Sequence, residues 1–305
     1  MPRSYRYLHL DVFTASRFGG NQLAVFLDGR GLTADLMQAI AKEMNFSEST
    51  FILPRETPDT DMRVRIFTPG AELPIAGHPT IGTAFALSHV GAVSPGESRV
   101  VFGLGVGPTP VELAWAADRL SFAWMTQPLP TFSPAVEARA LAAAALGLPG
   151  AAVEGAGLPV QIVSCGVPYL MIPLATRAQV DRAVVDAAAS EQLARAAGLG
   201  DAAFYVFTLE QGGTDEATVY SRMFGPALGI PEDPATGSAA GPLGCYLFEH
   251  RVLDAAKAAT IVNLQGVRMG RPSVIHVAIA SDAGTITRVR VGGEAVLAGE
   301  GTLYV

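Results

Sequence analysis

The chain has 305 residues, half of them apolar, with a formal net charge of −7 and a pI near 5.3. This length suits one large domain or two ordinary ones, and the acidic balance argues against a nucleic-acid-binding surface. No stretch is typical of a secretory signal or a membrane span. The only cysteines, Cys165 and Cys245, are isolated in the sequence and predict neither a disulfide framework nor a metal site. We expect a cytoplasmic protein with two buried thiols and no membrane association.

The first part of the chain predicts short strands and two helices. Strands are expected over residues 7–13, 23–29, 49–54 and 62–69, and residues 98–126 are typical of a meander. Helices are expected over residues 33–45, with Thr33 as the N-cap, and over 78–91.

The second part predicts helices over residues 134–148, 177–198 and 233–253, and strands over 159–174, 203–209, 217–226, 258–266, 273–280 and 286–305. The order does not alternate strictly between strand and helix, which disfavours a doubly wound sheet. The helices at 78–91 and 233–253 are apolar on most faces, so other elements have to enclose them. These patterns predict an α+β fold with strands around one apolar helix in each half.

A repeat connects the segments that lead into these two helices. The stretch "RIFTPGAELPIAGHPTIGTA" covers residues 65–84, and "RMFGPALGIPEDPATGSA" covers 222–239. Arg-x-Phe-x-Pro aligns in both, and Pro79 then aligns with Pro234. Because the matched order includes strand, loop, proline and helix, the repeat predicts two similar domains facing each other across a cleft.

This alignment pairs His78 with Asp233, each directly before a proline that suits the first helical position. Both residues are therefore predicted N-caps, beside unpaired backbone N–H groups and the positive end of a helix. Such an end favours an anion, most simply a substrate carboxylate. The helix end should lower the pKa of His78 and favour a neutral imidazole. Gly82 and Gly237 would leave the first turn open to a ligand.

Each candidate residue also has a structural interpretation. Asp233 is a common N-cap residue. Ser238 could serve only close packing, and it lacks a local nucleophile motif, so we favour a ligand-binding hydroxyl over a covalent nucleophile. Glu48 starts a strand beside Phe46 and Phe51, where it is either solvated or, if it faces the cleft, desolvated enough to transfer protons.

Five segments together resemble the phenazine-biosynthesis PhzF-like isomerase family. They are "DVFTASRFGGNQLAVFLD", "MNFSESTFIL", the two repeat stretches and "QGVRMGRPS", which occur in the family's order and span nearly the whole chain. The resemblance implies a diaminopimelate epimerase-like fold, with two pseudo-symmetric domains that each wrap a β-barrel-like sheet around a central apolar helix. We expect domains at residues 1–127 and 128–294, with a strand around 295–305 returning to the first domain.

The resemblance also implies an activity, which is cofactor-independent isomerisation of a small carboxylate-bearing metabolite. The family member that names the group isomerises trans-2,3-dihydro-3-hydroxyanthranilate. By resemblance, Glu48 transfers the proton, His78 and Asp233 hold or relay protons, and the substrate-binding residues are Ser238, Gly237 and Gly77. A homodimer and no metal are implied as well.

Two other functions remain open from the sequence. One is a non-catalytic metabolite-binding or interaction protein on the same fold. The other, a two-thiol amino-acid racemase, is disfavoured because neither helix start, "AGHPT" or "DPATGS", contains a cysteine.

Overall fold

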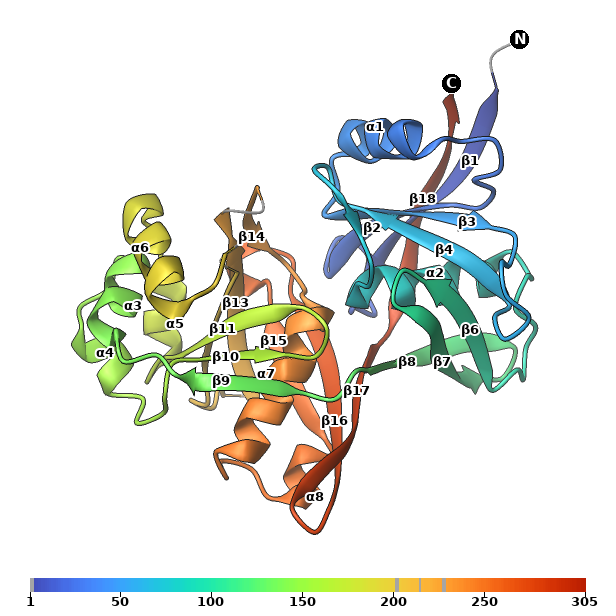
Figure 1. Cartoon of the computed structure of the whole chain (residues 1–305). Helices are drawn as coiled ribbons and strands as arrows, with labels where there is room; N and C mark the ends of the chain where they lie inside the picture. Colours follow the sequence, from blue (N-terminus) through green and yellow to red (C-terminus); the bar gives the residue numbers. More distant parts are fainter. Residues whose placement is uncertain (1–2, 201–202, 214, 227–228) are drawn as a thin grey trace. The chain divides into compact units, whose positions relative to one another are not determined.

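The computed structural model describes residues 3–200, 203–213, 215–226 and 229–305. The chain forms two compact units, shown in Figure 1: unit 1 comprises Met1–Thr126 and Val291–Val305, and unit 2 comprises Gln127–Arg290. Both units combine a mixed sheet with helices, so the predicted α+β class is confirmed. Within the described ranges, no helix is long and apolar enough to cross a membrane.

Unit 1 is built on a sheet whose neighbouring strands run in the order β18-β1-β2-β3-β4-β6-β7-β8. The C-terminal strand β18 pairs antiparallel with β1, and the two run side by side in Figure 1. The elements are β1 (Ser4–Val12), β2 (Asn21–Phe26), α1 (Ala34–Met44), β3 (Glu48–Leu53), β4 (Met62–Phe67), β5 (Glu72–Leu73), α2 (Gly77–His89), β6 (Arg99–Leu104), β7 (Gly107–Ala116), β8 (Arg119–Gln127) and β18 (Ala295–Tyr304).

The two faces of this sheet contact different helices. Helix α2 lies so close to one face that a Cβ on Gly82 would come within 2.5 Å of Leu23 and 2.7 Å of Val12. Gly82 therefore serves helix–strand packing, and the prediction that it leaves room for a ligand was wrong. On the other face, aromatic rings of β2, β3 and β4 pack under α1, whose predicted N-cap Thr33 is confirmed.

Unit 2 has strands in the order β9-β10-β11-β12-β13, and β13 also pairs with β14 and β15, which continues to β16. The elements are β9 (Thr131–Ala135), α3 (Arg139–Ala145), α4 (Ala151–Glu154), β10 (Gln161–Ser164), β11 (Pro168–Pro173), α5 (Arg177–Arg182), α6 (Ala187–Ala197), β12 (Phe204–Thr208), β13 (Val219–Gly225), β14 (Ile230–Asp233), α7 (Gly237–Glu249), α8 (Ala255–Ala258), β15 (Ile261–Gln265), a 3-10 turn (Val267–Met269), β16 (Ser273–Asp282) and β17 (Thr285–Gly293).

Unit 2 also places helices on both faces of its sheet. Helix α7 packs on one face, where the rings of Phe207 and Tyr246 lie 5.5 Å apart and Gly244 approaches Val277 of β16. The small helices α3 to α6 pack with apolar side chains of β11 and β12 on the other face. Because side chains alternate along each strand, the two faces of each sheet pack against different helices.

Two helix predictions in unit 2 need correction. The predicted helix at 177–198 is two helices, because the backbone leaves helical geometry at Ala183 and the Asp186 side chain accepts a hydrogen bond from the Ala189 N–H at 2.8 Å to start α6. The predicted helix at 134–148 begins only at Arg139, because residues 131–135 pair with β10 as a strand.

Candidate active site

The starts of α2 and α7 have the same local frame. Each helix has 13 residues and follows a Glu-x-Pro-x-x-Gly sequence, which ends at Gly77 in unit 1 and at Gly237 in unit 2. When the two sequences are aligned at the first residue of each helix, His78 therefore pairs with Ser238. The predicted pairing of His78 with Asp233 was wrong, although the repeat itself is present.

An ion pair in each unit fixes this register. Arg65 Nε lies 2.7 Å from Glu72 Oε1, and Arg222 Nε lies 2.8 Å from Glu232 Oε1; in both pairs the second guanidinium nitrogen binds the second carboxylate oxygen. The arginines belong to β4 and β13, and the glutamates to the short strands β5 and β14. The repeat therefore extends from the strand before each helix into the helix.

The predicted N-caps were also wrong. The N-cap residues are Ala76 and Thr236, whereas His78 is the second residue of α2 and Asp233 is the last residue of β14. Neither N-cap side chain accepts a hydrogen bond from the first turn of its helix. The helix-end argument for an anion therefore applies to the N–H groups that begin at Gly77 and Gly237.

In unit 1 the structure brings Glu48 and His78 together. Alternation along β3 directs Glu48 and Thr50 to the same face, and the Thr50 hydroxyl lies 3.0 Å from that of Thr83 on α2. On this face Glu48 Oε2 lies 3.2 Å from His78 Nε2, and the two side chains are only 12% and 4% exposed. A carboxylate and an imidazole thus lie in contact at a largely buried position.

Burial lowers the pKa of His78 to about 3, while a hydrogen bond with the backbone of Gln22 acts in the opposite direction. The predicted direction is right, but the cause is burial and not the helix end. The Asn21 amide nitrogen lies 3.2 Å from His78 Nδ1, so a second polar group contacts the ring on the side of β2.

In unit 2 the structure brings Asp233, Gly237 and Ser238 to the start of α7. Ser238 is half-buried between buried neighbours, and its hydroxyl lies 2.7 Å from that of Tyr169 on β11. Asp233 Oδ2 accepts a hydrogen bond from the Thr236 hydroxyl at 2.5 Å. Sequence reasoning missed Tyr169 and Gln265, because their contacts join strands distant in the sequence. It also missed Thr236, although Asp233 lies only three residues before it.

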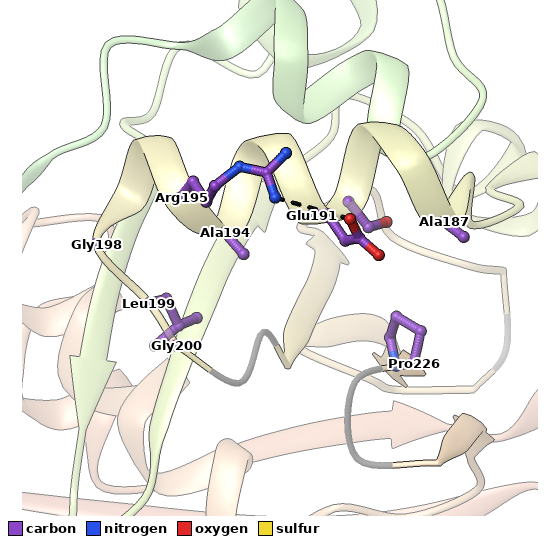
Figure 2. A pocket seen from close by; sticks show the side chains of 9 residues that line it. Ala187, Glu191, Ala194, Arg195, Gly198, Leu199, Gly200 and Pro226 are labelled. Atoms are coloured by element: carbon purple, nitrogen blue, oxygen red, sulfur yellow. Dashed lines mark ion pairs between the residues drawn. The ribbon is translucent and has the colours of Figure 1, made fainter.

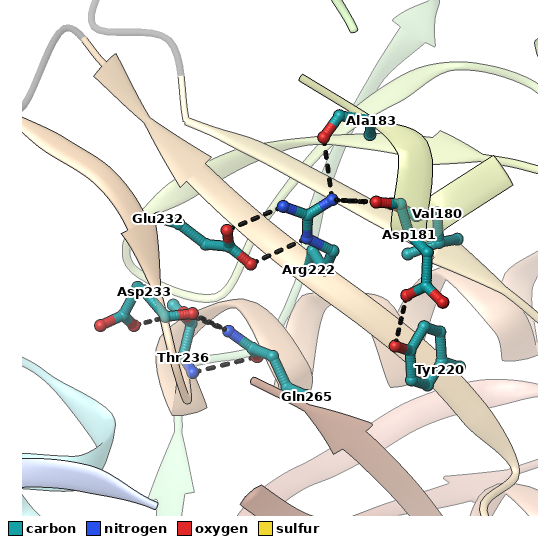
Figure 3. A network of polar contacts seen from close by, with 9 residues as sticks. All are labelled: Val180, Asp181, Ala183, Tyr220, Arg222, Glu232, Asp233, Thr236 and Gln265. Atoms are coloured by element: carbon teal, nitrogen blue, oxygen red, sulfur yellow. Dashed lines mark hydrogen bonds and ion pairs between the residues drawn. The ribbon is translucent and has the colours of Figure 1, made fainter. Parts of the chain in front are cut away.

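Gln265 holds the segment between Asp233 and α7. Figure 3 shows its side-chain amide between Asp233 and Thr236. Gln265 Nε2 donates to the Asp233 carbonyl at 2.7 Å, and Oε1 accepts from the Thr236 N–H at 3.1 Å. On the neighbouring strand, Arg222 donates to Glu232 and to carbonyl groups at the C-terminal end of α5. The segment that carries Asp233 is therefore fixed from both sides.

A separate cavity of about 480 Å³ lies in unit 2 beside α6 (Figure 2). Its lining includes Glu191, Arg195, Leu199 and Pro226, and none of the predicted site residues. The Glu191–Arg195 pair is exposed to solvent, with its nearest atoms 3.7 Å apart. This cavity contributes nothing to the candidate active site.

The two cysteines, which are 80 residues apart in the sequence, lie together in the structure. Their sulfur atoms are 3.9 Å apart, and both side chains are buried, as predicted. The contact with Cys165 and burial both raise the pKa of Cys245, which favours the neutral thiol. Both thiols belong to unit 2, so a racemase arrangement with one thiol from each half does not occur. Within the described part of the chain, no three His, Cys, Asp or Glu side chains gather as a metal site.

Comparison with known sequences places the chain in a family. The family described as phenazine biosynthesis-like protein matches residues 10–301. The chain is 37% identical to an uncharacterized isomerase of Mesorhizobium japonicum, covering 98% of both proteins. It is 35% identical to trans-2,3-dihydro-3-hydroxyanthranilate isomerase of Pseudomonas aeruginosa, covering 99% of this chain and 100% of that one.

Solved structures agree on the fold. A PhzF-family protein of Bacillus anthracis matches with a TM-score of 0.88 at 24% identity, covering 99% of this chain and 100% of that one. A hydroxyproline epimerase of Agrobacterium vitis matches with a TM-score of 0.63 at 12% identity, covering 99% and 93%. The protein is thus an isomerase with the predicted diaminopimelate epimerase-like fold. Within that class, the chain belongs to the phenazine biosynthesis-like protein family.

Proposed function

We propose that this isomerase moves a proton on a small carboxylate-bearing metabolite without a cofactor, and that Glu48 removes the proton from one carbon and returns it at another. The relative from Pseudomonas aeruginosa is named for trans-2,3-dihydro-3-hydroxyanthranilate, which makes this compound the first substrate to test. The relatives' names as isomerases favour this proposal over a non-catalytic binding protein.

The contact between Glu48 and His78 carries the proposal. Proton transfer needs an acid–base group that is positioned and partly withdrawn from water. The Glu48 carboxylate is largely buried, and its Oε2 lies 3.2 Å from Nε2 of the neutral His78 imidazole. A proton taken up by Glu48 therefore stays near the carbon atoms of a bound substrate, with the His78 ring packed beside the carboxylate.

The start of α7 supports the substrate-binding part of the proposal. The Ser238 hydroxyl and the Gly237 N–H hold the substrate carboxylate, because the first turn of a helix presents donors and a positive dipole end to an anion. In the same way, Gly77 offers its N–H beside His78. Asp233 relays or holds a proton at a polar group of the substrate.

Isomerisation in deuterium oxide tests the role of Glu48. With trans-2,3-dihydro-3-hydroxyanthranilate, the wild-type protein is expected to form the isomer and to incorporate solvent deuterium, detected by NMR. Glu48→Gln keeps the shape but not the base, and should lower the rate by about 10²–10⁴-fold. Glu300→Gln, which changes an exposed ion pair with Arg6 outside the site, is the matched control and should retain activity.

Equal rates for the wild type and Glu48→Gln would refute Glu48 as the base. An inactive wild type that is folded would exclude this substrate, and solvent exchange into other cyclic carboxylates would then be the next measurement.

We also propose that the protein forms a homodimer, as the family resemblance implies. Sedimentation velocity should give a mass of about twice the 31.7 kDa chain mass at micromolar concentration. A species with the mass of one chain at that concentration would refute the dimer.

A further inference from the structure

A buried polar network lies beneath Asp233, on the face of the unit 2 sheet that α7 covers. Tyr205 and Ser221 share that face because Ser221 pairs with Phe207, which is two residues from Tyr205 and contacts α7. Asn263 and Gln265, two residues apart on β15, join the same face through hydrogen bonds to Ser221 and Tyr205. These four side chains are at most 1% exposed, so their hydrogen bonds have no competition from bulk water.

The backbone fixes the orientation of the Gln265 amide. The Thr236 N–H can only donate, so the atom 3.1 Å from it is the Gln265 oxygen. The Asp233 carbonyl can only accept, so the atom 2.7 Å from it is the Gln265 nitrogen. The reversed amide would lose both hydrogen bonds.

This orientation in turn fixes the proton of the Thr236 hydroxyl. The Gln265 nitrogen also donates to Thr236 Oγ1, at 3.0 Å, so that oxygen acts as an acceptor there. Its own proton is directed to Asp233 Oδ2, 2.5 Å away. Oδ2 of Asp233 is therefore the acceptor of this hydrogen bond, which fixes the orientation of the side chain.

The Tyr205 hydroxyl fixes the position of the Gln265 side chain. Its hydroxyl accepts from the Asn263 amide nitrogen at 2.7 Å and donates to the Gln265 oxygen at 2.8 Å. Burial raises the pKa of Tyr205, and the nearby Asp233 carboxylate acts in the same direction, so the phenol keeps the proton that it donates. The hydrogen bonds therefore run in one direction from β15 to Asp233.

We propose that Thr236 and Gln265 are positioning residues that hold the Asp233 carboxylate in one orientation for the reaction. This inference rests on the proposed role of Asp233 in proton handling. Neither Thr236 nor Gln265 needs to touch the substrate, since both act through Asp233.

A double-mutant cycle tests the proposal, with trans-2,3-dihydro-3-hydroxyanthranilate as the substrate. Thr236→Val keeps the branched shape but removes the hydroxyl, and should lower kcat by about 10–100-fold, the value of a hydrogen bond to a charged group, with KM within about twofold. Thr236→Ser restores the hydroxyl and should recover most of kcat. In an Asp233→Asn background, Thr236→Val should have no further effect, because its partner carboxylate is already absent.

Gln265 provides a second variant with a matched control. Gln265→Met keeps the length of the side chain but removes the donor to Thr236, and should also lower kcat by about tenfold or more. Gln38 of unit 1 likewise donates to a backbone carbonyl, that of Thr68 at 2.8 Å, but it is outside the candidate site. Gln38→Met should therefore leave kcat unchanged.

The outcomes separate this inference from the proposed function. Full activity of Asp233→Asn would refute the proposed role of Asp233. A second outcome would overturn the positioning inference alone: Asp233→Asn lowers kcat, and Thr236→Val then lowers it further by the same factor as in the wild-type background. Crystal structures of the wild type and Thr236→Val give a readout that does not need turnover: a displaced Asp233 carboxylate supports the inference, and an unchanged one overturns it.

Discussion

The starts of α2 and α7 share the same local backbone arrangement but carry different polar side chains. Both follow Glu-x-Pro-x-x-Gly and both are tied to the preceding strand by an arginine–glutamate pair. The second helical residue, however, is His78 beside Glu48 in unit 1 and Ser238 beside Tyr169 in unit 2. The repeated backbone fixes where a side chain is placed, and the residue at that position decides which groups it contacts.

The residues before the two helices differ in the same way. Unit 1 has the apolar Leu73 and Ala76 at the positions where unit 2 has Asp233 and Thr236. Only the unit 2 pair is polar: the Thr236 hydroxyl donates to the Asp233 carboxylate, and Gln265 of β15 donates to the Thr236 hydroxyl. Polar side chains at buried positions need such partners, and here one of them comes from a distant strand.

The largest expected difference between the two frames concerns the arginine–glutamate pairs. Arg222 is 9% exposed and also donates to the carbonyls of Val180 and Ala183, whereas Arg65 is 21% exposed beside a Glu72 that is 37% exposed. Arg222→Leu should cost about 3–5 kcal/mol, the penalty for breaking a buried pair. Arg65→Leu should cost about 1 kcal/mol or less.

Urea unfolding of the two variants measures this difference. Arg222→Lys, which keeps the charge but not the two-pronged contact, provides an intermediate case if Arg222→Leu does not fold. Equal losses of stability for Arg65→Leu and Arg222→Leu would show that the two pairs are energetically equivalent despite their different burial.

Much of the fold follows from local patterns in the sequence. The apolar helices, the strands and the cap at Thr33 were predictable because periodicity and capping act within one element. The break between α5 and α6 was not predicted, because the alanine-rich segment around the N-cap residue Asp186 is typical of one continuous helix. The repeat was read in the wrong register because Pro79 and Pro234 match by letter, although one lies inside its helix and the other before it.

The sequence indicated candidate residues for the site but not the contacts that they make. Glu48 and His78 meet because β2 and β3 pair in parallel and α2 docks on that face, which are both long-range consequences of folding. Tyr169 and Gln265 reach the start of α7 from β11 and β15, and no local motif indicates either contact. Partners of site residues are set by tertiary packing, so the sequence alone could not supply them.

A smaller effect is expected at the hydroxyl of unit 2. If Ser238 holds the substrate carboxylate, Ser238→Ala should raise KM by about 10–100-fold, because a hydrogen bond to a charged group contributes about 1.5–3 kcal/mol. Tyr169→Phe removes only the neighbour of that hydroxyl and should raise KM by a factor of about 2–10. Steady-state kinetics of both variants checks this order, and an unchanged KM for Ser238→Ala would contradict the proposed binding role.

A last effect, about 2 kcal/mol, concerns the pH dependence of stability at the helix start of unit 1. Burial lowers the pKa of His78 from its ordinary value of 6.5 to about 3. Between these values the unfolded chain binds a proton that the folded protein excludes, so stability falls as the pH falls. The contribution of His78 is complete above about pH 6.5 and is progressively lost toward about pH 3.

Urea unfolding at pH 7.5 and pH 5 isolates this contribution. Over that interval the wild type should lose about 2 kcal/mol more than His78→Gln, because each pH unit below 6.5 costs about 1.4 kcal/mol. His89→Gln, at the exposed end of the same helix, is the control and should follow the wild type. Unit 2 has Ser238, which does not titrate in this range, at the matching position. If His78→Gln loses as much stability as the wild type between pH 7.5 and pH 5, the pH sensitivity arises outside the start of α2. The starts of α2 and α7 would then not differ in the pH dependence of stability.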